Sequence, residues 1–384
     1  MLALILSQLS RTVGHFFLFH DFPDNVRKLH KRPTPSTGGI AVVGATVAGA
    51  ALTIPFMFEF ISEGMTEFLL YMIAGAVVIV LTGIIDDVFG LSFKPKFFMQ
   101  LFAAVLVLWG LETQFIAEHI RYSETPAGWR LVFYGIFVLW IVAGCNTVNL
   151  IDGIDGLAGS IGLTSIFGIA VLSVTWGIAD VLPVIVPLGA ALLGFLWLNR
   201  PPAAIFMGDT GSMFTGFMIA VSILVLAVHA THWMYALALV LLLSIPLMDT
   251  VFAIIRRTKQ GINPFESDNN HIHHMLQRYF EGPGLAVVTL SAASMVMVTV
   301  AILLSNIDNP QLFFFIYGIL FSLFVFIAVI YSVKIKSRTS VIYTHMIRKD
   351  SARKNSELQD KEPVNVDIRR PTGSAGRDIV NSNK

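Results

Sequence analysis

Ten long apolar runs restrict the possible folds of this chain more than any other feature. They lie at about 39–58, 68–85, 97–111, 131–147, 159–178, 181–198, 211–229, 233–255, 285–305 and 311–333. A helix needs roughly 20 apolar residues to cross the hydrocarbon of a bilayer. Barrel strands would instead alternate apolar with polar residues, and these runs are continuous. We therefore expect an all-α polytopic integral membrane protein, a bundle of about ten full transmembrane helices.

The composition agrees with extensive contact with lipid. Of 384 residues, 55% are hydrophobic and 13% are charged, whereas a soluble domain carries roughly a quarter charged residues. The net charge of +1 gives no indication of a nucleic-acid partner. The single cysteine, Cys145, excludes an internal disulfide framework and a multi-cysteine metal site, and we expect it to be a packing residue.

The two ends of the chain differ from the apolar runs. Met1 to Leu9 is apolar but short, and no basic residue precedes it and no cleavage site follows it, so it resembles a truncated N-terminal helix rather than a signal peptide. Residues 334–384 are polar, and we expect a largely disordered tail. Residues 1–333 are then a single transmembrane domain.

Basic residues predict the orientation. Loops that would share one side hold fourteen Lys and Arg residues, and the opposite loops hold two, Arg121 and Arg130. Lysine and arginine accumulate in cytoplasmic loops. The first set, which includes Arg32, Lys96, Arg256 and the tail, is therefore expected to be cytoplasmic.

Acidic and amide side chains gather in two of these cytoplasmic segments. Asp86 and Asp87 end an apolar run, where two adjacent carboxylates are costly without a cation or donor. The next segment places Asn146, Asn149, Asp152 and Asp155 at three-residue intervals, a spacing that projects side chains to one side of a helical turn. The glycine after each aspartate permits close approach of a ligand.

Two further segments add phosphate-binding chemistry. Gly208-Asp209-Thr210-Gly211-Ser212 precedes an apolar run, so its amides can attract phosphate, and a carboxylate there can hold magnesium; a simple N-cap turn is the alternative. Arg256 and Arg257 precede His271-Ile272-His273-His274. These histidines suit contacts to phosphate, sugar or base better than zinc, because no cysteine accompanies them.

Two other features are weaker indications of function. Asp249 is an acid inside the eighth run, which makes it a weak functional candidate. The basic segment 27–32 suits anionic headgroups, although retention on the cytoplasmic side would also explain it. Together these segments suit a magnesium ion, a nucleotide diphosphate and a lipid phosphate, because phosphoryl transfer depends mainly on positioning and charge stabilisation.

In this order the motifs resemble those of the polyprenyl-phosphate N-acetylhexosamine-1-phosphate transferase family. The similarity covers about residues 20–333, and Pro264-Phe265 before the histidines resembles the branch that uses UDP-N-acetylglucosamine. The family usually has eleven spans, and the first is here reduced to about Met1–Leu9. The resemblance implies a bacterial plasma-membrane enzyme that starts a cell-envelope polysaccharide by making undecaprenyl-pyrophosphoryl-N-acetylglucosamine and UMP.

The resemblance also implies roles for individual residues. Asp209 would ligate Mg²⁺, with Mn²⁺ as the alternative ion, and Asp86 and Asp87 would act on the lipid phosphate or assist in metal binding. Asp152 and Asp155 would assist catalysis. The remaining predicted residues would bind substrate: Asn146, Asn149, Arg32, Lys96, Arg256, Arg257, His271, His273 and His274.

Alternatives remain at this point. Another UDP-N-acetylhexosamine or the phospho-N-acetylmuramoyl-pentapeptide donor would serve the same chemistry, and a homodimer is compatible with it. A covalent aspartyl intermediate is the alternative to direct attack by undecaprenyl phosphate. An ion-coupled transporter is disfavoured, because transporters place coupling acids near the midplane, whereas these acids lie at span ends.

Overall fold

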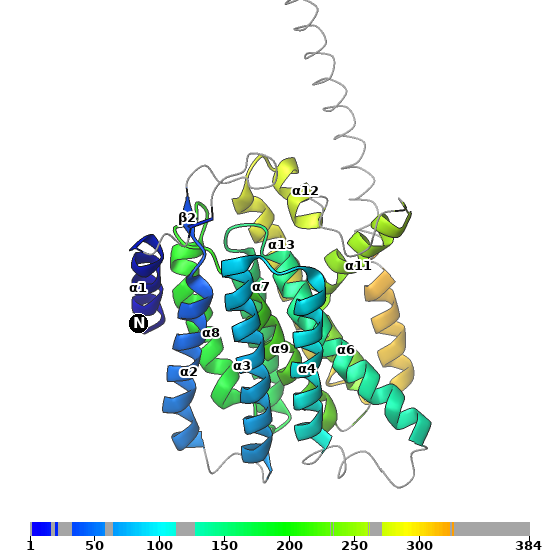
Figure 1. Cartoon of the computed structure of the whole chain (residues 1–384). Helices are drawn as coiled ribbons and strands as arrows, with labels where there is room; N and C mark the ends of the chain where they lie inside the picture. Colours follow the sequence, from blue (N-terminus) through cyan, green and yellow to red (C-terminus); the bar gives the residue numbers. More distant parts are fainter. Residues whose placement is uncertain are drawn as a thin grey trace, which may run out of the picture. The chain divides into compact units, whose positions relative to one another are not determined.

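The described residues form a bundle of α-helices with one very short sheet (Figure 1). The computed structural model describes residues 2–16, 20–21, 33–57, 64–112, 127–230, 232, 234–259, 261, 271–322 and 325. The helices are α1 (Leu2–Phe16), α2 (Gly38–Met57), α3 (Met65–Phe89), α4 (Phe93–Leu111), α6 (Ala127–Ile151), α7 (Leu157–Thr175), α8 (Leu182–Asn199), α9 (Gly208–His229), α10 (Met234–Val240), η3 (Leu241–Leu243), α11 (Ser244–Lys259), α12 (Ile272–Tyr279) and α13 (Pro283–Leu304). The strands β1 (His20–Asp21) and β2 (Thr34–Pro35) pair antiparallel.

The predicted all-α membrane fold is confirmed. Within the described residues, nine helical segments are long and apolar enough to cross a membrane, and they match the first nine predicted runs. A shorter apolar helix, Pro310–Ser322, covers the described start of the tenth run. The predicted tail, 334–384, lies outside the described residues. The chain is therefore a multi-pass membrane protein.

Several helix boundaries differ from the prediction. The N-terminal helix continues to Phe16, well beyond Leu9. α4 begins at Phe93, earlier than the predicted apolar run. Its first turn includes Lys94 and Lys96, which interrupt the apolar pattern. The eighth run is divided into α10, η3 and α11. These changes place more polar residues on helices than the apolar pattern alone suggested.

α9 is the centre of the bundle, and it is buried along nearly its whole length. Three neighbouring helices approach its backbone at glycines, since any larger side chain would collide there. A Cβ on Gly39 of α2 would meet the backbone of Gly211, and one on Gly83 of α3 would meet Thr210. Gly144 of α6 faces Gly216 and Ala220. Backbone contact without intervening side chains lets short polar groups reach across helices.

We expect Gly144→Ala to destabilise the bundle without touching the polar loops. Its new Cβ would lie 2.5 Å from the Ala220 Cβ and 2.9 Å from the Gly216 carbonyl oxygen, so α6 must move away from α9. Overpacking of this kind costs about 1–3 kcal/mol. Thermal unfolding in detergent measures the loss. Gly135→Ala on the same helix is the control, because its Cβ meets nothing within 4 Å, and equal melting of the two variants would contradict the expectation.

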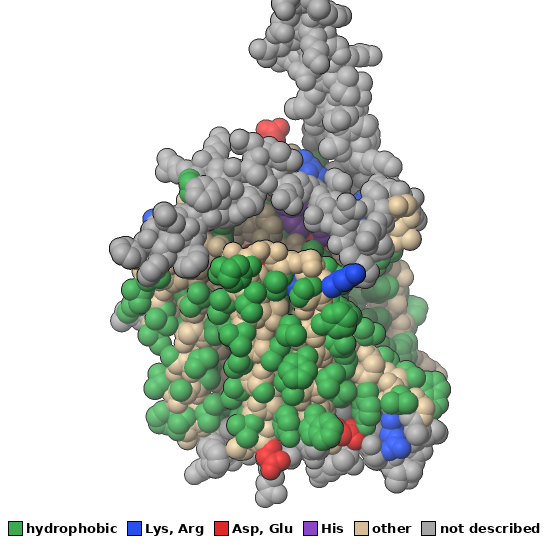
Figure 2. All heavy atoms as spheres, viewed as in Figure 1, with side chains coloured by type: hydrophobic (Ala, Val, Ile, Leu, Met, Phe, Trp, Pro, Cys, Tyr) green, Lys and Arg blue, Asp and Glu red, His purple; other side chains and the backbone are tan. Residues whose placement is uncertain are grey.

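The polar segments meet at one end of the bundle, here called the polar end: the end at which α3, α6 and α8 finish and α4, α7 and α9 begin (Figure 1). A segment after β2 is fixed there, because Phe206 N–H donates to Pro35 O at 2.8 Å and Gly38 N–H donates to Phe206 O at 3.0 Å. Figure 2 shows hydrophobic side chains over the flank of the bundle and histidine side chains near its polar end.

Candidate active site

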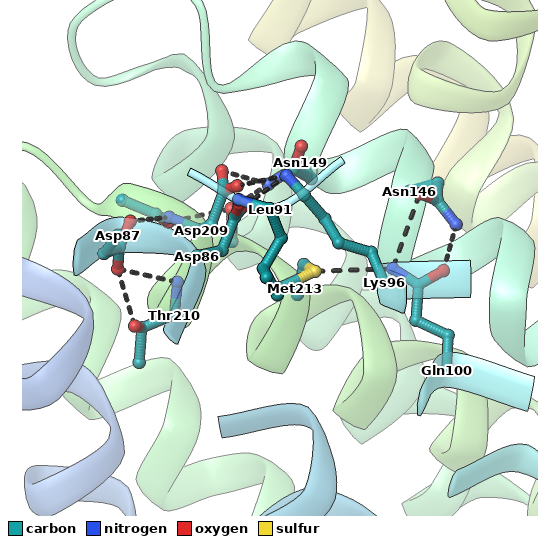
Figure 3. Close-up of polar contacts among 12 residues, drawn as sticks. Asp86, Asp87, Leu91, Lys96, Gln100, Asn146, Asn149, Asp209, Thr210 and Met213 are labelled. Atoms are coloured by element: carbon teal, nitrogen blue, oxygen red, sulfur yellow. Dashed lines mark hydrogen bonds and ion pairs between the residues drawn. The ribbon is translucent and has the colours of Figure 1, made fainter. Parts of the chain in front are cut away.

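Two carboxylates from different helices share one ammonium group (Figure 3). Asp86 lies in the last turns of α3, and Asp209 in the first turn of α9. Lys96 of α4 forms an ion pair with Asp86, and its Nζ donates to Asp209 Oδ2 at 2.8 Å. Asp86 is buried, and its Oδ1 also accepts the Leu91 backbone N–H at 2.6 Å. The lysine therefore offsets two negative charges at the start of α9.

Amides at the end of α6 complete this group. Because α6 continues to Ile151, Asn146 and Asn149 are helical rather than in a loop. Asn149 Nδ2 lies 2.6 Å from Asp209 Oδ1 and 3.0 Å from Ser212 Oγ, so it orients the carboxylate. Asn146 instead donates to Gln100 Oε1 at 2.5 Å. The two asparagines therefore have different partners: Asn149 contacts Asp209, and Asn146 contacts Gln100 within the bundle.

Asp87 has a different environment from Asp86. Its Oδ1 accepts the Asp209 N–H at 2.8 Å, while its Oδ2 accepts the N–H and hydroxyl of Thr210 at 3.1 and 2.6 Å. These are free amides of the first turn of α9, so Asp87 caps that helix from a neighbouring one. Gly83 makes this possible, because its missing side chain lets α3 lie against Thr210.

The turn after α6 contains the other two predicted acids. Asp155 Oδ2 accepts the Ala203 N–H at 2.9 Å, and Asn199 Oδ1 accepts the Gly156 N–H at 2.8 Å, so the turn is fixed to the segment after α8. Asp152 is half-buried. Burial, with the nearby carboxylates of Asp87 and Asp155, raises the pKa of Asp152 well above its usual range. Its carboxyl group therefore holds a proton more readily than an exposed aspartate does.

The histidine motif packs against this turn. His273 is buried, and its ring centroid lies 5.3 Å from that of His271 and 4.3 Å from that of His274. Burial, with the neighbouring histidines, lowers the pKa of His274 to about 4, so its ring is neutral near pH 7. A Cβ on Gly153 would lie 2.7 Å from His273 Nε2 and 3.1 Å from His274 Nε2. The missing side chain of Gly153 is what lets the histidines approach the acidic turn.

Gly153→Ala is therefore expected to lower activity by displacing the histidine rings. Gly153 does not have positive φ, so the effect should come from the new methyl group rather than from backbone strain. A displacement of about 1 Å at a positioned group can cost about 100-fold in rate. Steady-state kinetics measure the loss. Gly282→Ala is the matched control, since its Cβ meets nothing within 4 Å, and an equally small effect of both changes would contradict the expectation.

The structure brings most predicted site residues together, in two neighbouring groups. The first contains Asp86, Asp87, Lys96, Asn149 and Asp209, and the second contains Asp152, His273 and His274 around Gly153. Arg257 is buried beside His271, with Arg257 Nη2 3.3 Å from His271 Nε2, and Arg256 lies on the same helix. Arg32 lies outside the described residues.

Two residues beside the site were not predicted from the sequence as strong candidates: Gln100 and Asp249. Gln100 is fully buried and lies 3.3 Å from Met213 Sδ, where it joins α4 to α6 and α9. It lies inside the predicted apolar run 97–111, where a polar side chain is itself a signal. Asp249, a weak candidate from the sequence, accepts hydrogen bonds from the histidine motif.

The first group contains the oxygen ligands that a divalent cation such as magnesium prefers. Magnesium binds carboxylate and carbonyl oxygens, and Asp86 and Asp209 already place carboxylate oxygens around one positive charge, that of Lys96. The residues present therefore fit a divalent cation. Separately, the ligand atoms of Asp249, His271 and His273 lie within 4.8 Å of one another.

Comparison with known proteins gives consistent similarities. The family model for glycosyl transferase family 4 matches residues 69–227. A probable undecaprenyl-phosphate N-acetylglucosaminyl 1-phosphate transferase of Bacillus subtilis (strain 168) is 35% identical over 290 residues, 74% of this chain and 77% of that protein. The undecaprenyl-phosphate alpha-N-acetylglucosaminyl 1-phosphate transferase of Escherichia coli (strain K12) is 30% identical, covering 70% and 72%. The decaprenyl-phosphate N-acetylglucosaminephosphotransferase of Mycobacterium tuberculosis (strain ATCC 25618 / H37Rv) is 34% identical, covering 65% and 67%.

Proposed function

Since the chain belongs to glycosyl transferase family 4, we propose that it transfers N-acetylglucosamine 1-phosphate from UDP-N-acetylglucosamine to undecaprenyl phosphate. The observation that supports this most directly is the sharing of Lys96 by Asp86 and Asp209 beside Asn149. Such a group suits a metal-bound diphosphate. The names of the relatives supply the sugar and the lipid.

In the proposed reaction an oxygen of undecaprenyl phosphate attacks the β-phosphorus of UDP-N-acetylglucosamine. A new P–O bond forms, the P–O bond to the α-phosphate breaks, and UMP leaves with that bridging oxygen. The products are undecaprenyl-pyrophosphoryl-N-acetylglucosamine and UMP. A phosphate monoester has a second pKa of about 6, so the attacking oxygen is largely ionised and needs no strong base.

The residues of the site supply binding and charge in this reaction. A divalent cation, Mg²⁺ or Mn²⁺, would be held by Asp209 with Asp86 and would stabilise negative charge on the diphosphate. Lys96 Nζ, which donates to Asp209 Oδ2, would also donate to phosphate oxygens, and Asn149 holds the Asp209 carboxylate in place. Asp87 caps α9 and so keeps Asp209 in position. The histidines and Asp152, around Gly153, bind the sugar nucleotide.

The membrane arrangement follows from the same proposal. The polar end faces the cytoplasm of a bacterium, where nucleotide sugars are made, and the basic residues of its loops agree with that orientation. The tail, 334–384, is then also cytoplasmic. The acceptor lipid reaches the site from the membrane, in which its isoprenoid chain remains.

A defined assay tests the function. Purified protein in nanodiscs is supplied with undecaprenyl phosphate and one radiolabelled UDP-sugar at a time, with Mg²⁺, Mn²⁺ or a chelator. We expect equal amounts of UMP and lipid-linked N-acetylglucosamine phosphate, and no transfer with the chelator. Faster transfer from another UDP-N-acetylhexosamine or from the muramoyl-pentapeptide donor would overturn the sugar assignment. Formation of a phosphorylated enzyme without lipid would overturn direct attack.

A further inference from the structure

Asp249 lies on α11, and its buried carboxylate holds the histidine motif. Its Oδ1 accepts the Ile272 backbone N–H at 2.6 Å. Its Oδ2 lies 3.1 Å from His271 Nδ1 and 2.8 Å from His273 Nδ1. Because an ionised carboxylate accepts hydrogen bonds and cannot donate them, both ring Nδ1 atoms must carry a proton. In a neutral ring with Nδ1 protonated, Nε2 is the atom that has a free lone pair.

The two anchored rings differ at Nε2. His271 Nε2 lies 3.3 Å from Arg257 Nη2, so that atom already faces a protein donor. His273 Nε2 is buried and has no hydrogen-bond partner among the described residues. It points at the acidic turn, since a Cβ on Gly153 would lie 2.7 Å from it. A buried, unpaired nitrogen costs free energy unless a ligand pairs with it.

We propose that Asp249 is a positioning residue that fixes the Nδ1–H tautomer and the ring orientation of His273, so that His273 Nε2 is presented to the sugar nucleotide. This rests on the proposed function, and it divides the histidine motif into two roles. His271 links Asp249 to Arg257 within the protein. His273 contacts substrate.

A bound metal is the competing explanation of the same three residues, because their ligand atoms lie within 4.8 Å of one another. Two observations favour the hydrogen-bonded arrangement. Arg257 Nη2 lies 3.3 Å from His271 Nε2, and His271 Nδ1 contacts Asp249, so both ring nitrogens of His271 already have protein partners. Both Nδ1 atoms already contact Asp249 at hydrogen-bond distances.

Asp249→Asn gives a sharp test, because an asparagine amide cannot accept hydrogen bonds from both Nδ1–H groups while it also accepts the Ile272 N–H. The Ile272 N–H requires an oxygen at the Oδ1 position, so the amide nitrogen occupies the Oδ2 position that both rings contact. An amide nitrogen donates, so His273 must then accept at Nδ1 and carry its proton at Nε2. We expect kcat to fall about 100-fold, with a changed pH profile. Asp249→Glu retains a carboxylate and should remain within about 10-fold of the wild type.

The tautomer is read by ¹⁵N NMR of histidine-labelled protein in nanodiscs, with the His273 signals identified by their loss in His273→Gln. We expect a protonated Nδ1 and an unprotonated Nε2 in the wild type, and the reverse in Asp249→Asn. Asp180→Asn is the matched control. Asp180 is also buried, and its Oδ2 lies 3.9 Å from His229 Nε2. It lies between the end of α7 and the start of α8, which is the end of the bundle opposite to the polar end. It should leave kcat and the His273 signals unchanged.

Several results would overturn the inference. Wild-type kcat in Asp249→Asn would do so, as would a loss of kcat with the His273 tautomer unchanged. A stoichiometric transition metal that is present in the wild type and lost in Asp249→Asn would identify a metal site instead. The NMR result does not depend on the reaction, so a wrong donor sugar would refute the proposed function while leaving the tautomer test intact.

Discussion

Asp209→Asn is expected to lower transfer of N-acetylglucosamine 1-phosphate by about 1,000-fold or more, because loss of the proposed metal ligand would remove several kcal/mol of charge stabilisation. The amide keeps the shape of the side chain, and its oxygen can still accept the hydrogen bond from Asn149. The first turn of α9 loses a favourable negative charge, which costs about 1 kcal/mol or less. Measurement of kcat over a range of Mg²⁺ concentrations, with thermal unfolding of the same sample, tests both expectations.

The control for this change is Asp308→Asn, which replaces a carboxylate that accepts a hydrogen bond from Tyr235 at 2.9 Å. Tyr235 follows the end of α9 opposite to Asp209, so the loss of its contact with Asp308 should not affect transfer. Asp209→Glu retains a ligand of the right charge and should keep more activity than the asparagine variant. If Asp209→Asn transferred sugar phosphate at the wild-type rate, the proposed metal role of this residue would be wrong.

Lys96→Met is expected to reduce transfer by about 100-fold and also to lower stability. The ammonium offsets Asp86 and Asp209 together, and in the proposed reaction it would donate to the diphosphate. Removal of one well-placed donor costs about 100- to 1,000-fold in rate. Asp86 is buried, so leaving it without its cation should cost about 1–3 kcal/mol of folding free energy. Steady-state kinetics and thermal unfolding separate the two effects.

Lys94→Met is the matched control for the lysine change. Lys94 lies two residues earlier in the first turn of α4 and is exposed, so methionine there removes the same charge without touching Asp86 or Asp209. It should change activity and stability little. Similar losses in the two variants would mean that the general positive charge of this loop matters, rather than the position of Lys96 between two carboxylates.

Much of the fold could be predicted from the sequence because hydropathy is a local property. A run of about 20 apolar residues must form a helix in lipid, where each backbone polar group needs a partner within its own segment. Because consecutive spans cross the membrane in opposite directions, the segments at Asp86, Asn149, Asp209 and His273 come to the same end of the bundle. The ends of the helices were less predictable, since polar residues such as Lys96 and Asn149 are compatible with a terminal turn.

The roles within each motif could not be predicted, because they depend on which atoms meet across the bundle. Asp86 and Asp87 are adjacent in the sequence, yet one pairs with Lys96 and the other caps α9. His271 and His273 are equivalent by spacing, but Arg257 lies against the first ring and Gly153 against the second. The local sequence pattern shows which residue types lie at a membrane boundary, but it does not show which residues they contact.

The amino-acid sequence by itself determined that this protein spans a membrane many times and that its acids, amides and histidines gather where helices end, because apolar length and loop polarity act segment by segment. The tertiary structure alone decided that Lys96 stands between Asp86 and Asp209, and that Asp249 holds the histidines. Those contacts join helices far apart in the chain, such as Lys96 and Asp209 at a separation of 113 residues. Which side chains meet depends on how the helices pack: Gly83, for example, brings α3 against the start of α9, so that Asp86 and Asp209 both lie within reach of Lys96.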